Sequence, residues 1–421
     1  MPIDFTLSAE QSALQAGVRQ FAKEHLSGAY ASYSHLAPGK DRFQATRPIY
    51  EKAVAAGMIA GQIPPPLGGK AGSLIDAALM GEEFYAVESS ASLTILGTGL
   101  GLAALVLHGS PEQHKRYLKP FLDSSSLAPL ASLVSSEFGG SANAFADDGG
   151  AGIQTVAVLE GDEWVISGEK AWATNCAGWD YGGADLQCVV CRTEKTWPPS
   201  ASGAIILVTR EDIDRNPKGA YEVIEDIETI GHTAVCGPRI RFNNLRVHKS
   251  NILGKPGDGP RMLAMTFTTS AALVCAASVG IMRATFDAAL NFSKSDRRGG
   301  RDPIINHQSV ADLLIDIKMR IETSRYLCWK ALHNIETRGD GELAYMAKIY
   351  GSECAVQSVY DAMRVVGVTS YSVKMPFGRL MEDALCMPIF DGGNVGVRRR
   401  QLQKLMTEAG YDPQSAAFGK S

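Results

Sequence analysis

The sequence lacks an excess of charge of either sign. Its 421 residues include 41 basic and 45 acidic side chains, which are interspersed, and the net charge is −4. Proteins that bind nucleic acid, and segments that anchor to membranes by charge, concentrate basic residues in one patch. We therefore expect neither partner. Hydrophobic residues make up 45% of the chain and charged residues 20%, which is ordinary for a folded protein with buried cores.

Cysteine and histidine are also scarce. Eight cysteines in a chain of this length do not form a disulfide scaffold, and most stand in apolar runs, as buried thiols of a reduced compartment do. Cys188 and Cys191 have the CxxC spacing, but in a strand their side chains point to opposite faces, and no second pair or nearby histidine completes a zinc site. The eight histidines are scattered. The sequence therefore predicts no metal site.

Signals for membrane insertion and targeting are missing as well. Polar residues interrupt the apolar stretches, so we expect no helix of about 18 apolar residues that spans a bilayer. Residues 1–11 lack the basic start and apolar run of a signal peptide, and residues 419–421 are not the Ser-Lys-Leu ending of peroxisomal proteins. We therefore expect a soluble protein of the cytoplasm.

The texture of the sequence changes twice, which predicts three domains, at residues 1–128, 129–252 and 253–421. The first region is helical and opens on a capping-box pattern at Ser8. The second contains short β-branched runs and glycine-rich turns, which are typical of a β-domain. The third returns to long amphipathic helices, such as the apolar stripe through residues 310–332, and predicts a helical bundle. The fold class is therefore α+β and multidomain.

Residues 97–101, Gly-Thr-Gly-Leu-Gly, contain glycines like those of a dinucleotide-binding loop. The last glycine is misplaced for that motif, and no strand–loop–helix unit surrounds the segment. We therefore interpret these glycines as positions where a helix packs closely against its neighbours.

The stretch with the most chemical information is Pro388-Ile389-Phe390-Asp391-Gly392-Gly393-Asn394, which leads to three arginines at 398–400. The two glycines allow the backbone to approach a bound ring closely. A helix that begins at Asn394 places Arg398 in its second turn, where the guanidinium can reach back to Asp391 and keep the carboxylate ionised, as a general base requires. The arginines project about 100° apart, so at most one can do this. The alternative is that Asp391 caps the helix and the arginines form a solvated face.

Four separated segments, in the same order, resemble the acyl-CoA dehydrogenase family across nearly the whole chain. Residues 111–118 resemble its GSEEQKxRYLP helix, residues 133–143 its LTEPxxGSD strand and loop, and residues 168–175 its GxKxWITN segment. Residues 298–308 resemble the RxxFGxxIxxxQ stretch that holds the FAD pyrophosphate and adenosine. Asp391 stands where the family's YEGTxxIQR motif places its catalytic glutamate.

This resemblance implies the acyl-CoA dehydrogenase fold, with an N-terminal helical domain, a middle β-domain and a C-terminal four-helix bundle. It also implies bound FAD and a homotetramer, because the family's QxxGG segment, here residues 363–367, contacts the FAD of a neighbouring subunit. The implied cofactor-binding residues are Leu133, Val134, Ser135, Ser136, Ser141, Ala142, Asn143, Trp172, Ala173, Thr174, Arg298, His307, Gln308, Arg364, Ile389, Phe390, Asp391, Gly392 and Gly393.

Departures from the family pattern resemble one branch, the nitroalkane oxidases. Asp391 replaces glutamate, and residues 392–394, Gly-Gly-Asn, replace the usual Gly-Thr-Ser. Residues 42–48 and 177–181 also resemble this branch. Ser270, next to an Ala-Ala-Leu-Val segment, resembles the branch's serine that hydrogen-bonds near the base. The alternative for Ser270 is a hydroxyl bonded to its own helix backbone.

The resemblance implies an FAD-dependent nitroalkane oxidase, which converts neutral primary and secondary nitroalkanes to aldehydes or ketones and releases nitrite and hydrogen peroxide. Asp391 removes the α-proton with Arg398 and Ser270 beside it, the carbanion adds to flavin N5, and molecular oxygen reoxidises the flavin. An alternative is an acyl-CoA dehydrogenase that uses Asp391 as its base. Thr174 favours that alternative, because the nitroalkane oxidases have serine there. A remote alternative is a helical scaffold without a cofactor.

Overall fold

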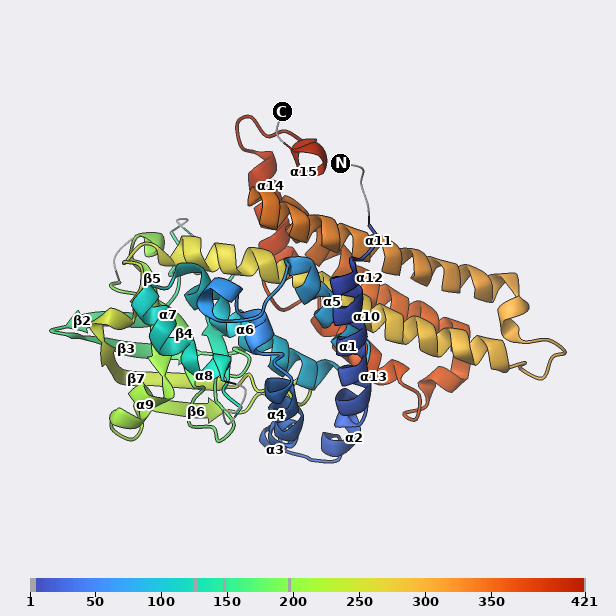
Figure 1. Ribbon diagram of the computed structural model, residues 1–421, viewed down its shortest axis with the longest axis horizontal. Helices are drawn as coiled ribbons and strands as arrows, with labels where there is room; N and C mark the ends of the chain where they lie inside the picture. Colours follow the sequence, from blue (N-terminus) through green and yellow to red (C-terminus); the bar gives the residue numbers. More distant parts are fainter. Residues whose placement is uncertain (1–4, 124–127, 147–148, 196–197, 420–421) are drawn as a thin grey trace.

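Helices occupy both ends of the sequence, and the residues between them form a β-domain. In space this domain lies at one end of the molecule, on the left in Figure 1. The computed structural model describes residues 5–123, 128–146, 149–195 and 198–419. Residues 1–4 and 420–421, on which part of the targeting expectations rests, lie outside the described residues. The N-terminal helices are α1 (Ala9–Phe21), α2 (Ala29–Tyr33), α3 (Gly39–Ala45), α4 (Arg47–Ala55), α5 (Leu74–Tyr85), α6 (Ser89–His108), α7 (Pro111–Tyr117) and α8 (Lys119–Leu122).

The predicted helix-start signals are present in the structure. The Ser8 side chain accepts a hydrogen bond from the Gln11 N–H at 3.1 Å, and the Gln11 side chain accepts one from the Ser8 N–H at 3.1 Å, which completes the capping box of α1. Ser110 and Gln113 form the same reciprocal pair at the start of α7. These bonds satisfy backbone donors that have no partner inside the helix.

The middle of the chain forms one sheet in the described residues, with strand order β6-β7-β3-β2-β4-β5-β8, and β1 pairs in parallel with β4. Its strands are β1 (Ala131–Val134), β2 (Val156–Glu160), β3 (Glu163–Lys170), β4 (Leu186–Arg192), β5 (Gly203–Thr209), β6 (Tyr221–Glu225), β7 (Arg239–His248) and β8 (Ile252–Leu253). Short helix α9 (Arg210–Arg215) follows β5. The β2–β3 pair is an antiparallel hairpin that turns at Gly161-Asp162.

Close packing joins the sheet to α6. A Cβ added at Gly97 would lie 2.7 Å from Thr174 Cγ2, and one added at Gly101 would lie 2.3 Å from the backbone of Ala131. The interpretation of these glycines as packing positions is therefore confirmed. Cys188 and Cys191 on β4 belong to two different hydrophobic clusters, in agreement with side chains on opposite faces of the sheet.

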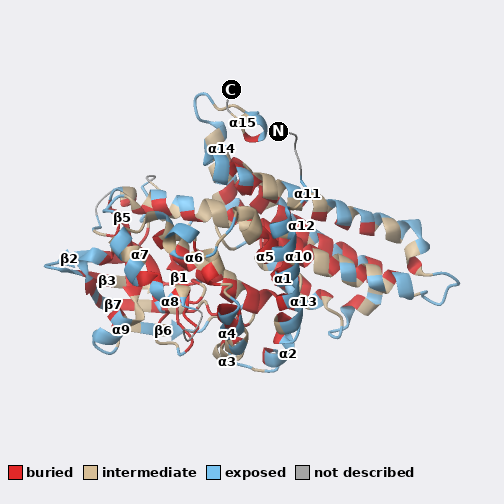
Figure 2. Cartoon of the chain, in the orientation of Figure 1, coloured by how far each residue is buried: buried red, intermediate tan, exposed pale blue. Residues whose placement is uncertain are grey.

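The C-terminal region is a set of long packed helices. They are α10 (Gly259–Ser295), α11 (Gln308–Arg338), α12 (Glu342–Val366), α13 (Phe377–Cys386), α14 (Arg399–Met406) and α15 (Ser415–Phe418), with a π-helical turn η8 (Asn394–Arg398) before α14. On α11 the predicted stripe is buried from Leu314 to Leu332 against α10 and α12. Figure 2 shows buried segments in red where these helices lie against one another. The sequence did not predict α13.

The expectation that no helix is long and apolar enough to span a bilayer was wrong on length and composition. Both α6 and α10 meet that criterion. The polar residues that interrupt α6 are mostly serine, threonine and glycine, which lower its hydropathy too little. In the fold, 61% of each apolar window is buried inside the protein. Both are therefore core helices of this fold.

Candidate active site

Asp391 lies in a tight turn between α13 and η8. Asp391 has φ +52° and Gly392 has φ +70°, so the backbone reverses through two consecutive left-handed residues. A non-glycine residue with such a φ is uncommon, and it persists where the surrounding structure holds it. The Asn394 N–H donates to the Pro388 carbonyl at 2.9 Å and closes the turn. The turn therefore presents the Asp391 side chain from a fixed backbone.

Arg398 and Ser270 both contact the Asp391 carboxylate. Arg398 Nη2 donates to Asp391 Oδ2 at 3.0 Å, and Ser270 Oγ donates to Asp391 Oδ1 at 2.8 Å. The Arg398 side chain is 0% exposed and the Asp391 side chain 5%. A charge-assisted hydrogen bond is stronger where water is excluded, so these two contacts hold the carboxylate firmly in one orientation.

Arg398 also fixes the backbone of the turn. Its Nε and Nη2 donate to the Asp391 carbonyl at 3.1 and 2.6 Å, and Nη2 lies 3.1 Å from the Phe267 carbonyl of α10. The cap position of η8 is Gly393, and no side-chain bond caps that turn. The alternative in which Asp391 caps the helix is therefore wrong. As expected, one arginine reaches Asp391, while Arg400 donates to the loop at 142–143.

Ser270 combines the two alternatives that its sequence left open. Its hydroxyl lies 3.3 Å from the Phe267 carbonyl of its own helix and 2.8 Å from Asp391 Oδ1. The contact with the carboxylate is shorter, and an ionised acceptor forms the stronger bond. Ser270 thus belongs to the immediate surroundings of Asp391.

The end of β1 and the loop after β3 form a second part of the site. The Ala171 N–H donates to the Ser136 carbonyl at 3.0 Å, and Ser132 Oγ donates to the Thr174 carbonyl at 2.7 Å. This places Leu133 to Ser136 beside Trp172, Ala173 and Thr174. Trp172 has φ +67° and its side chain is 50% exposed. We call the surface formed by residues 133–136 and 172–174 the ledge, and Trp172 is exposed at its edge.

The loop at residues 141–143 joins this ledge to the turn. Ser141 Oγ accepts a hydrogen bond from the Glu137 N–H at 3.0 Å. Arg400 of α14 donates to the Ala142 carbonyl and to Asn143 Oδ1. The structure therefore brings residues 133–136 together with 172–174, and it joins residues 141–143 to α14, which follows the Asp391 turn.

The remaining predicted cofactor residues lie elsewhere. Arg298 Nη1 donates to Thr369 Oγ1 at 3.1 Å, and Arg364 Nη1 donates to Asp361 Oδ1 at 3.1 Å. His307 and Gln308 begin α11 in the same region. The stretch of α10 from Ser270 to its end at Ser295 is roughly 38 Å long at about 1.5 Å per residue. We name Arg298, Arg364, His307 and Gln308 the distal group, because the length of α10 separates this region from Asp391 in the same chain.

Sequence reasoning missed Lys348, a buried residue of α12 that contacts both ends of the turn. Its Nζ donates to the Met387 carbonyl at 2.7 Å and to Asn394 Oδ1 at 3.0 Å. A signal was present, because Ala344, Ala347 and Gly351 share the buried face of α12 and the helical spacing places Lys348 on that face. A lysine on a face of small residues is unusual.

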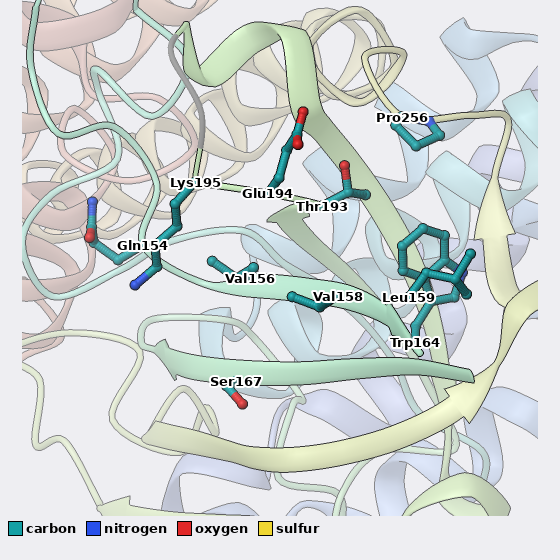
Figure 3. A pocket seen from close by; sticks show the side chains of 10 residues that line it. All are labelled: Gln154, Val156, Val158, Leu159, Trp164, Ser167, Thr193, Glu194, Lys195 and Pro256. Carbon is teal, nitrogen blue, oxygen red and sulfur yellow. The ribbon is translucent and has the colours of Figure 1, made fainter. Parts of the chain in front are cut away.

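A hollow of about 710 Å³ lies on the β-domain, lined by residues that include Val158, Trp164 and Glu194 (Figure 3). None of the predicted site residues lines it. It is an open surface depression next to the β2–β3 hairpin and shares no residue with the Asp391 site.

Comparisons with known proteins agree with this fold. Residues 8–125 match the acyl-CoA dehydrogenase N-terminal domain, and residues 257–406 match the acyl-CoA dehydrogenase C-terminal domain. A solved butyryl-CoA dehydrogenase from Megasphaera elsdenii has the same fold, with a TM-score of 0.81 over 96% of this chain and 100% of that chain at 21% identity. The fold and the carboxylate turn thus define a protein of the acyl-CoA dehydrogenase class.

More similar relatives place the chain within that class. A nitroalkane oxidase from Podospora anserina is 49% identical over 100% of this chain and 99% of its own length. A solved nitroalkane oxidase crystallised with 1-nitrooctane superposes with a TM-score of 0.96, over 99% of this chain and 100% of that chain, at 44% identity. The chain belongs to the nitroalkane oxidase family, whose members are flavoproteins.

Proposed function

We propose that this protein is an FAD-dependent oxidase of neutral primary and secondary nitroalkanes, and that Asp391 removes the α-proton of the substrate. The observation that carries this proposal is the state of the Asp391 carboxylate. Its side chain is nearly buried. One oxygen accepts a hydrogen bond from Arg398 and the other accepts one from Ser270. An ionised carboxylate offers about four acceptor positions, so capacity remains to accept a proton.

The nitro group makes the α-proton acidic, so one positioned carboxylate suffices for the reaction. The α C–H bond breaks, its proton moves to Asp391, and its electron pair stays on the substrate as an anion. Arg398 and Ser270 each contact one oxygen of the carboxylate and hold it in position to receive the proton. When bound, FAD would supply the acceptor for the electron pair of this anion, with molecular oxygen as the final oxidant. Overall, nitroalkane, oxygen and water give aldehyde or ketone, nitrite and hydrogen peroxide.

The residues near the turn fit a flavin. The ledge at 133–136 and 172–174 offers backbone groups, small side chains and the exposed Trp172 indole, against which a flat ring can lie. Thr174 is packed so closely on Gly97 that the floor of this ledge is fixed. We propose that these residues, residues 141–143 and residues 389–393 hold the cofactor.

We further propose a homotetramer in which the distal group of one chain completes the FAD site of another. The support is the roughly 38 Å stretch of helix between Ser270 and the end of α10, which is too long for one bound dinucleotide to contact both groups. We also propose a cytoplasmic location, supported by eight cysteines that are all free thiols. Analytical ultracentrifugation and cell fractionation test these two points.

One experiment tests the activity. The purified protein is examined for flavin absorption and then mixed anaerobically with nitroethane and, separately, with an acyl-CoA. We expect flavin reduction by nitroethane, and nitrite release with oxygen consumption in air. Absence of flavin, with no uptake of added FAD, would contradict the enzyme assignment. Turnover of acyl-CoA with an artificial electron acceptor, and without nitrite from nitroethane, would support the dehydrogenase that Thr174 favours.

A further inference from the structure

Lys348 contacts both ends of the turn that carries Asp391. Its side chain is completely buried on α12. The Nζ atom donates to the Met387 carbonyl, before the turn, and to Asn394 Oδ1, after it, at 2.7 and 3.0 Å. Asp391 lies between these two attachment points. A single ammonium group therefore sets the separation of the two ends.

The Asn394 side chain extends this attachment to two more residues of α12. Its Nδ2 donates to Ser352 Oγ at 3.0 Å and to Glu353 Oε1 at 2.9 Å. Ser352 Oγ in turn donates to the Lys348 carbonyl at 2.6 Å. The turn is thus held from one side by Arg398 and from the other by a hydrogen-bond network on α12.

The charge of Lys348 is not required by its direct partners. Both are neutral oxygens, and within the described residues no carboxylate forms an ion pair with Nζ. Burial is the main cause that lowers the pKa of Lys348 to about 8. The charge of Asp391 acts to raise this pKa, the charge of Arg398 lowers it further, and Glu353 and Cys275 act to raise it. A buried, unpaired ammonium is costly, and an apolar side chain of similar volume would fill the space. Among the charges near Lys348, the Asp391 carboxylate is the one that most strongly favours the ammonium form.

We propose that Lys348 is a positioning residue for the Asp391 base: it holds the turn in the conformation for proton abstraction and places a cation against the two ends of that turn. This inference rests on the proposed function. It concerns the deprotonation step, so it predicts no role for Lys348 once the substrate is already an anion.

The test compares Lys348→Met with the wild type, using a neutral nitroalkane and its preformed anion as substrates. Wild-type oxidation of the neutral nitroalkane establishes the proposed function; its absence would refute that function and this inference with it. For Lys348→Met we expect kcat/KM with the neutral substrate to fall roughly 10- to 100-fold, the range for bonds to a charged group. Activity with the anion and the flavin content should stay near wild type. The exposed Lys404→Met on α14 serves as the matched control.

A second variant, Lys348→Gln, separates the attachment from the charge and provides a test if the methionine variant fails to fold. The amide can still donate to the Met387 carbonyl, so we expect a smaller loss of rate. The pH profile of kcat/KM should be displaced as in Lys348→Met, because the cation is missing in both. Equal losses with the neutral and anionic substrates would show that Lys348 only maintains the fold. An unchanged pH profile in both variants would overturn the electrostatic role.

Folding stability gives a readout that is independent of activity. The pKa of Lys348 falls from 10.5 to about 8 on folding. Below pH 8 the lysine is charged in both states, and the cost of burying the charge is fully present. Between about pH 8 and 10.5 the folded state releases its proton first, so this contribution makes the protein more stable as pH rises. The difference in stability between wild type and Lys348→Met should change in that window, and a constant difference would count against a buried ammonium.

Discussion

Two buried pairs of a cation and a carboxylate, Arg398 with Asp391 and Lys170 with Glu137, look alike but differ in how the carboxylate is used. Glu137 Oε1 accepts from Lys170 Nζ at 3.0 Å, from the Thr155 N–H at 2.9 Å and from Thr155 Oγ1 at 2.7 Å, and Oε2 accepts from the Gln154 N–H at 2.7 Å. About four acceptor positions exist on a carboxylate, so Glu137 is saturated. Asp391 accepts one bond on each oxygen.

This difference separates a structural carboxylate from a reactive one. Burial alone would raise the pKa of Glu137, but the Lys170 charge and the Thr155 and Gln154 donors reverse this and hold its pKa below the ordinary value. Glu137 therefore fixes the loop after β1, and its four donors oppose the uptake of a proton. Among the described residues, Asp391 accepts only two hydrogen bonds, so fewer donors oppose proton uptake there. The number of donors, rather than the presence of an ion pair, distinguishes the two.

The largest expected effect is that of Asp391→Asn on proton abstraction. The amide keeps the shape of the side chain but cannot act as a base, so flavin reduction by a neutral nitroalkane should slow about 100- to 10,000-fold. A preformed nitroalkane anion needs no base and should react at a rate near that of the wild type. Stopped-flow flavin reduction with both substrates measures this. Equal loss with both would mean that Asp391 holds the cofactor or the fold.

The matching change in the saturated pair, Glu137→Gln, should affect stability instead. It leaves Lys170 buried without its counter-charge, which costs about 3–5 kcal/mol in the free energy of unfolding. Because the pKa of Glu137 is depressed, its contribution is present above pH 4.5 and is lost as the pH falls through the lower folded-state value. Denaturation at neutral and acid pH measures both effects. If Glu137→Gln had normal stability but reacted slowly with a neutral nitroalkane, Glu137 would have a catalytic role and the contrast with Asp391 would be wrong.

Arg398→Lys should have an intermediate effect. Lysine retains the charge but cannot hold the Asp391 carboxylate, the Asp391 carbonyl and the Phe267 carbonyl together, as the planar guanidinium does. We expect roughly a 10-fold to 100-fold loss of kcat/KM with a neutral nitroalkane, and a displaced pH profile. Arg399→Lys is the control, because Arg399 is the next residue, is exposed, and begins α14. An unchanged profile would show that the guanidinium does not tune the base.

Ser270→Ala should have the smallest effect. It removes one hydroxyl donor from the charged Asp391 Oδ1, and such a bond contributes about 1.5 kcal/mol at the lower end of the range for charged groups, or roughly 10-fold in rate. Steady-state kinetics with a neutral nitroalkane measures the change, and Ser295→Ala at the end of the same helix is the control. A loss as large as that of Asp391→Asn would mean that Ser270 takes part in proton transfer itself.

The parts of the site that the sequence predicted are those that depend on neighbouring residues in the chain. Asp391 and Arg398 are seven residues apart across a glycine turn, so local geometry was enough to predict their contact. Ser270 is 121 residues from Asp391, and its partner could be settled only by the packing of α10 against the turn. Lys348 was missed for the same reason, because its acceptors lie 39 and 46 residues away.

The same distinction applies to the fold. The capping box at Ser8 and the stripe on α11 follow from short-range patterns, and these predictions were confirmed. The apolar length of α6 and α10 was misjudged, because serine, threonine and glycine were counted as interruptions although they pack well inside a protein. The wide separation of the distal group from Asp391 depends on the unbroken length of α10, which the motifs alone did not reveal.

The length of α10 has a consequence for how the protein keeps its cofactor. In the proposed tetramer each FAD is held by two chains, so dissociation of subunits and release of FAD are linked equilibria. By mass action, dilution should favour loss of FAD, and added FAD should favour assembly. The flavin content of this protein would then depend on its own concentration, and a cell that makes little of it would hold proportionally more of it without cofactor.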